Sequence, residues 1–208
     1  MGLLDTFLSG LFSKARTIAT ASELADFMDS RAAFLSQKCV VEFCRVRAGV
    51  HWEKLFREVE FQEELRQSRW KSYPPAFAMV VEMVEGVLRP AAGLEQRSLP
   101  FALESLAREV FTRYPVPDKA PETFWQDALD LVRERLAATQ EGGPRPVRVV
   151  PKPTARLIFN ALPLHKDVVT NDYDYIFNNL RMNLLRIHDD FLELAKLEPL
   201  AEDVLRKA

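Results

Sequence analysis

The sequence predicts an all-α protein, a multi-helix bundle of about seven or more helices. In a long C-terminal stretch, residues 167–197, apolar side chains recur at alternating spacings of four and three: Tyr173, Phe177, Leu180, Leu184, Ile187, Phe191 and Leu194. This spacing is typical of an amphipathic helix that packs at a low crossing angle against other helices. No run of residues alternates like a paired strand, and glycines and prolines divide the remaining apolar stretches into helix-sized segments. We therefore expect residues 167–197 to form a long helix that acts as the central strut.

The composition fits one soluble globular domain. The chain has 208 residues, of which 48% are hydrophobic and 28% are charged. Such a chain suits one large domain, or one domain with a short appendage. The formal net charge is −2 and the pI is about 6.0, so there is no basic excess to neutralise phosphates and we expect no nucleic acid partner.

The sequence also predicts a cytoplasmic location. No apolar stretch is long enough to span a bilayer. A secretory signal is not indicated, because no Lys or Arg precedes the apolar N-terminus and Asp5 interrupts it.

Residues 1–20 are predicted to be an N-terminal amphipathic arm, separate from a single helical domain over residues 21–208. One face of this predicted helix is apolar, and the opposite face carries small and weakly charged side chains. Such a helix folds back onto its own domain, docks in a partner's groove, self-associates, or lies at the inner face of a membrane. The side chains that would dock are Leu4, Phe7, Leu8, Leu11, Phe12 and Ile18.

The first helices of the domain are predicted from the residues that end them. A helix over residues 22–48 is apolar on two sides, which predicts a position between neighbours, and Gly49 ends it. A helix over residues 50–71 is apolar early and charged later, and Pro74-Pro75 ends it. The charged half leaves two large aromatic side chains, Phe61 and Trp70, without an explanation.

Residues 76–88 are nearly all apolar, which predicts the most buried helix of the core or a homodimer interface. A loop over residues 89–97 follows. Leu99-Pro100 begins a helix that ends at Tyr114-Pro115, and Pro121 begins another that Gly142-Gly143 breaks.

Residues 141–153 hold four prolines and the basic residues Arg145, Arg148 and Lys152. We predict an extended strap held on the helices by Val147, Val149 and Val150, with a linker or recognition segment as the alternative. A short helix over residues 154–162 precedes the long C-terminal helix, and Pro199 begins a final turn or two.

The sharpest candidate for chemistry is an acidic cluster on the long helix, formed by His188, Asp189, Asp190 and Glu193. Carboxylates on one helical arc can hold Mg²⁺ bound to a diphosphate substrate. The motif resembles the Asp-Asp-x-x-Asp/Glu motif of isoprenoid synthases over these few residues alone. That resemblance implies a second acidic helix across a cavity, for which the sequence offers only ordinary surface patterns. We prefer a charged outer face.

Other chemistry has less support. Cys39 and Cys44 lie in an apolar helical stretch at a spacing that suits neither chelation nor a disulfide, so we expect reduced core thiols. No nucleophile elbow or phosphate-binding glycine motif is present. Three asparagines near the middle of the long helix, Asn178, Asn179 and Asn183, predict polar contacts between helices, or the lining of a ligand pocket.

These observations favour a non-catalytic adaptor, scaffold or assembly protein that acts on a protein partner through helical surfaces, without a cofactor. One alternative is a small-ligand-binding or metal-dependent all-α enzyme that uses the acidic cluster. The other is a peripheral membrane protein anchored by residues 1–20.

Overall fold

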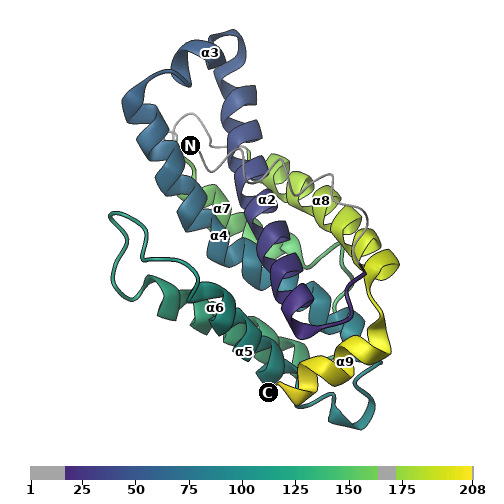
Figure 1. The fold of residues 1–208 in the computed structure, drawn as a ribbon. Coiled ribbons are helices and arrows are strands. Elements are labelled where there is room, and N and C mark those ends of the chain that lie inside the picture. Colours follow the sequence, from purple (N-terminus) through teal and green to yellow (C-terminus); the bar gives the residue numbers. More distant parts are fainter. Residues whose placement is uncertain (1–16, 164–171, 208) are drawn as a thin grey trace.

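The computed structural model describes residues 17–163 and 172–207 (Figure 1). The predicted N-terminal amphipathic helix lies largely outside these residues, as do its docking candidates Leu4, Phe7, Leu8, Leu11 and Phe12. The described residues form a packed bundle of α-helices, of which seven have ten residues or more, and they contain no β-strand. The predicted fold class is therefore confirmed.

The helices follow one another along the chain, and the longest described connections are residues 112–123 and 141–150. Two 3₁₀ turns, Gly49–His51 and Gly93–Glu95, lie between them. The α-helices are α2 (Ala21–Ala48), α3 (Trp52–Leu55), α4 (Val59–Leu88), α5 (Leu99–Phe111), α6 (Phe124–Gln140), α7 (Pro151–Ala161), α8 (Tyr173–Leu194) and α9 (Leu197–Arg206).

Helix α4 lies at the centre of the bundle. It packs against α2, α6 and α7, and every residue from 72 to 85 is buried. The prediction that the long C-terminal helix is the central strut is wrong in this respect. Helix α8 has one apolar stripe, which packs on α2 and α7, whereas the middle of α4 is buried on all sides. The same burial within one chain agrees with the first alternative for residues 76–88, the most buried helix of the core.

Pro74 and Pro75 lie inside α4, which corrects the prediction that they end a helix. A proline in a helix interior removes a hydrogen bond and costs about 3 kcal/mol or more. Burial against three neighbouring helices offsets this cost, and the Thr154 hydroxyl of α7 donates to the Pro75 carbonyl at 3.2 Å. The predicted helices over residues 50–71 and 76–88 are therefore one helix from Val59, preceded by the 3₁₀ turn and α3.

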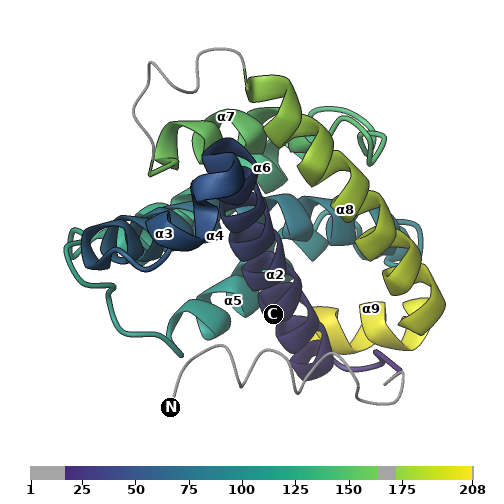
Figure 2. The ribbon, with the colours of Figure 1, turned by 90° about the horizontal axis from the view of Figure 1, so that it is seen from above.

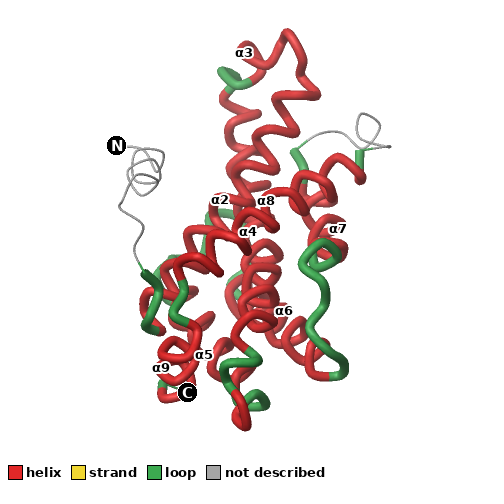
Figure 3. The backbone as a smooth tube through the Cα atoms, turned by 90° about the vertical axis from the view of Figure 1, so that its right-hand side faces the viewer, coloured by secondary structure: helices red, strands yellow, loops and turns green. Residues whose placement is uncertain are grey.

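Helix α2 begins and ends where the sequence predicts, within one residue. Thr20 and Glu23 form a capping box at its start, and Gly49 follows its end with a φ of +54°. With α3 and the first turns of α4, the far end of α2 projects beyond the other helices (Figures 1 and 3). The α2–α4 hairpin is thus longer than the bundle that surrounds its lower part.

The described N-terminal segment is anchored beside the end of α8. The Ile18 amide donates to the Leu194 carbonyl and the Lys196 amide donates to the Ile18 carbonyl, both at 2.9 Å. Ile18 is extended and only 4% exposed. This docking candidate therefore belongs to the core of its own domain.

Residues 141–150 lie across α4 and α6 as a strap would, but residues 147–150 form a turn and are not extended as predicted. Arg89 donates to the Gly142 carbonyl at 3.3 Å, and Arg135 donates to the Val150 carbonyl at 3.1 Å. Val150 is buried. The strap is shorter than predicted, because Pro151 begins α7, where a proline fits the first turn of a helix.

Figure 2 shows α8 along one edge of the molecule, with α7 beside its N-terminal half and α9 after its C-terminal end. Within the described part of the chain, no helix is both long and apolar enough to cross a membrane.

Candidate functional site

The predicted acidic cluster lies on the outer side of α8. Asp189 and Glu193 are exposed, and Asp190 forms an ion pair with Arg31 of α2 at 3.1 Å. His188 Nδ1 lies 3.4 Å from Asp189 Oδ1. Among the described residues, no group of three potential ligand side chains is placed to hold a metal ion. The arrangement agrees with a charged outer face that is tied to α2 at one point.

Both cysteines are buried in α2 and neither forms a disulfide. Burial raises the pKa of the Cys39 and Cys44 thiols from 9.0 to about 12. A thiol with so high a pKa stays protonated at neutral pH and is a poor nucleophile. The two residues serve as small apolar side chains of the core.

A groove runs between α2 and the middle of α8. It has a volume of about 440 Å³ and is open to solvent. Helix α2 supplies charged side chains to it, and α8 supplies amides, one cation and two apolar side chains. The lining residues are Lys38, Glu42, Tyr175, Asn178, Asn179, Met182, Asn183 and Arg186.

The residues from α8 follow one another at three- and four-residue spacings, beside the apolar seam of the same helix. The three asparagines predicted to make interhelical contacts or to line a pocket all lie here. Asn183 donates to the Asn179 carbonyl at 2.8 Å, and Asn179 donates to Glu42 at 3.1 Å. Asn178 is exposed. Asn179 therefore connects α8 to α2, Asn183 supports it from the same helix, and the exposed Asn178 faces solvent.

The groove also holds exposed apolar surface. Met182 is 49% exposed and Tyr175 is 37% exposed, although the Tyr175 ring lies 5.8 Å from the buried ring of Phe43. Burial and the nearby Glu42 carboxylate raise the pKa of Tyr175. A phenol that stays protonated can donate a hydrogen bond at neutral pH.

Sequence reasoning did not single out the contributions of Lys38, Glu42 and Met182. Lys38 lies 3.3 Å from Glu42 in an ion pair on α2, a spacing common on any solvated helix. The one feature of the sequence that could have indicated the groove is Met182, an apolar residue that lies outside the apolar seam of α8. The groove as a whole requires knowledge of which face of α2 meets α8, which spacing along the chain does not give.

Comparison with models of known protein families, with curated proteins and with solved structures finds no match to the chain. The function proposed below therefore rests on the residues and their arrangement.

Proposed function

We propose that the protein is a non-catalytic adaptor that holds a segment of a partner protein in the groove between α2 and α8. The observation that carries the proposal is the exposed pair Met182 and Tyr175, placed among amide side chains between two long helices. Grooves between helices commonly bind a helical or extended segment, with apolar anchors that give affinity and polar groups that fix its position.

The shape of the groove favours a peptide segment over a small molecule. Small-molecule sites enclose most of the ligand surface and are lined mainly by apolar side chains. This groove is open to solvent, and six of its eight lining residues carry an amide or a charged group, beside the larger apolar surfaces of Met182 and Tyr175. A segment that lies along α8 would cover both apolar side chains and reach the exposed Asn178 amide.

Site-specific photo-crosslinking in the native host tests the proposal. A photoreactive amino acid replaces the exposed Asn178, and in a control protein it replaces Leu94, which is fully exposed far from the groove. We expect a discrete adduct from position 178 alone, and its loss when Met182→Glu is added. Thermal melting of each variant shows that the fold is kept. Equal adducts from both positions, or none from position 178, would refute a groove-binding adaptor.

The predicted arm over residues 1–20 remains a second part of this proposal. The described chain is anchored at Ile18, beside the C-terminal end of α8, so the arm is attached at one end of the helix that lines the groove. Flotation with liposomes separates the two uses of the arm, with the full chain compared with a chain that begins at Thr17. Flotation of the full chain alone would assign the arm to a membrane surface. If neither chain floats and the truncated chain stays folded, the arm is assigned to a protein surface.

A further inference from the structure

The chain is acidic overall, yet one stretch of it carries only positive charge. Residues 142–166 contain no Asp or Glu. In the described part of this stretch, Arg148, Lys152 and Arg156 are exposed, and none of them forms an ion pair with a described residue. Two of them lie on α7, next to the N-terminal half of α8. Positive charge is therefore concentrated on this side of the molecule.

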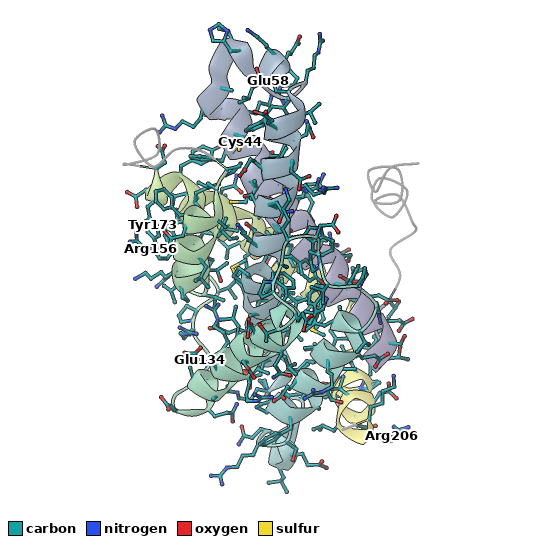
Figure 4. All side chains as sticks on the ribbon, turned by 90° about the vertical axis from the view of Figure 1, so that its left-hand side faces the viewer. Cys44, Glu58, Glu134, Arg156, Tyr173 and Arg206 are labelled. Carbon is teal, nitrogen blue, oxygen red and sulfur yellow. The ribbon has the colours of Figure 1, made fainter. Side chains whose placement is uncertain are left out.

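Aromatic rings hold two guanidinium groups on this side. Arg156 lies 4.4 Å from the ring centre of Tyr173, and Arg181 lies 5.5 Å from that of Phe177. The two rings are parallel to within 4°, with centres 6.4 Å apart. The Tyr173 hydroxyl donates to the Lys152 carbonyl at 3.1 Å, which fixes the start of α8 on α7. Figure 4 shows Arg156 and Tyr173 beside each other.

These contacts prepare the guanidiniums for an anion. A guanidinium over a ring face keeps its N–H edges free for a carboxylate, and the loss of side-chain freedom has already occurred. Tyr173 and Arg181 are eight residues apart, roughly 12 Å along the axis of α8 and a little more than two turns. Acidic side chains two turns apart on a helical segment, or three to four residues apart on an extended one, match this spacing.

The line of basic side chains that begins with Arg156 and Arg181 continues into the groove. Arg181 is adjacent in sequence to Met182, and on the other side of Met182 the exposed Arg186 has no ion pair with a described residue. Of the acidic residues nearby, Glu42 is engaged by Lys38 and Asn179, and Asp190 pairs with Arg31, whereas Asp174 and Asp189 are exposed. A segment along α8 would therefore meet unpaired cations on both flanks of its apolar contact.

We propose that the partner segment bound along α8 is acidic, with carboxylates that pair with Arg156, Arg181 and Arg186 and an apolar side chain that covers Met182. This proposal rests on the adaptor function and adds the chemistry of the partner. A peptide fits better than a nucleic acid, because the whole chain has 28 basic and 30 acidic residues and so lacks the excess that a polyanion requires. It fits better than a lipid surface, because the cations, one on α7 and two on α8, border an amide-lined groove.

Fluorescence anisotropy with defined peptides tests this inference on the full chain. The probe is a labelled twelve-residue peptide of Glu, Asp and Leu, and the controls are its Lys counterpart and its Gln counterpart. We expect the acidic probe to bind best, and to weaken as salt rises from about 50 to 500 mM because exposed charges are screened. Arg156→Gln with Arg181→Gln should weaken it about tenfold or more, and Lys at both positions should restore most of the affinity.

Two comparisons make the result specific. Lys54→Gln with Arg97→Gln removes the same charge from two exposed positions elsewhere and should change the affinity by less than about twofold. Vesicles rich in phosphatidylserine and single-stranded oligo-dT are tested in parallel. Equal losses in the two double variants would overturn the inference, and so would stronger binding of vesicles or oligo-dT that depends on Arg156 and Arg181.

The two proposals can fail separately. If position 178 forms its adduct but the acidic peptide does not compete for it, the groove binds a partner of other chemistry and only the inference fails. If position 178 forms no adduct, the adaptor function itself fails, whatever the peptide does.

Discussion

The guanidinium of Arg145 lies 2.6 Å from the Oε1 atom of Glu82, and the Arg135 Nε atom lies 2.7 Å from the other oxygen. The Glu82 side chain is 1% exposed on the central helix, whereas Arg145 belongs to the strap. One turn further along α4, the buried Glu85 carboxylate pairs with Arg89 at 2.8 Å. The strap is thus attached to the core of the bundle through a buried carboxylate.

Loss of the Arg145 side chain should destabilise the protein. Removal of one partner of a buried ion pair leaves a desolvated charge, which costs about 3–5 kcal/mol when no other partner remains. Because Arg135 still faces Glu82, we expect Arg145→Ala to lower the free energy of unfolding by about 1–3 kcal/mol. Urea denaturation measures the change. The control is Arg148→Ala, an exposed strap residue that forms no ion pair with a described residue, which should change stability by less than about 0.5 kcal/mol. Equal effects would show that Arg145 does not hold the strap.

The Asp29 carboxylate of α2 accepts hydrogen bonds from two tyrosines. The Tyr73 hydroxyl donates to one oxygen at 2.6 Å and the Tyr114 hydroxyl to the other at 2.7 Å. Burial raises the pKa of both tyrosines, and the Asp29 charge raises it further. We expect Tyr73→Phe and Tyr114→Phe each to lower the free energy of unfolding by about 1–3 kcal/mol, as for hydrogen bonds to a charged group.

The stability losses of the two substitutions should be non-additive, because both phenols donate to one carboxylate. Thermal and urea unfolding of the two single variants and the double variant give the coupling energy. Tyr175→Phe is a matched control, since the structure gives the Tyr175 hydroxyl no hydrogen-bond partner among the described residues. A double variant that loses the exact sum of the single losses would argue against a shared acceptor.

Local signals in the sequence predicted much of this fold. The seam of α8 was predicted from its spacing, and its central members Leu180, Leu184 and Ile187 are buried. A 3.6-residue period is a property of one helix and needs no information about neighbours. The end of α2 was predicted for the same reason, because the Gly49 stop signal involves only the residues at its own helix end.

The sequence was less informative where the outcome depends on packing. Pro74-Pro75 reads as a helix end, but tertiary contacts keep α4 continuous through both prolines. Trp70, unexplained in the sequence, lies 6.0 Å from the ring of Tyr114 and 6.1 Å from that of Trp125, which come from later parts of the chain. The groove could not be predicted from the sequence for the same reason, because its two walls become neighbours only when α2 and α8 pack together.

The acidic residues of α8 should be dispensable for folding and insensitive to metal. In the described structure Asp190 pairs with Arg31 across partly exposed side chains, a contact worth up to about 1 kcal/mol. We expect Asp189→Asn, Asp190→Asn and Glu193→Gln together to lower stability by no more than this. Added Mg²⁺ should shift the melting temperature of the native protein and of the triple variant equally. A Mg²⁺-dependent rise in the native protein alone would restore the metal-site interpretation.

The buried thiols should make the protein sensitive to alkali. Burial raises the pKa of Cys39 and Cys44 from 9.0 in the exposed state to about 12 in the folded state. The unfolded chain therefore loses these protons first, and the stabilisation that the protonated thiols provide is fully present below pH 9 and is lost as the pH rises toward 12. We expect the free energy of unfolding to fall over this interval.

Replacement of both cysteines by alanine isolates their part of this slope. The variant should be less stable at neutral pH, because it loses buried sulfur atoms, but its stability should fall less steeply with alkaline pH. Tyr73 and Tyr114, whose pKa values are also raised, are still present and supply the remaining slope. Thiol labelling gives an independent measure: in the native protein at pH 8, a maleimide should react at the rate of unfolding or local opening, and rapid labelling of folded protein would contradict the burial of both sulfurs.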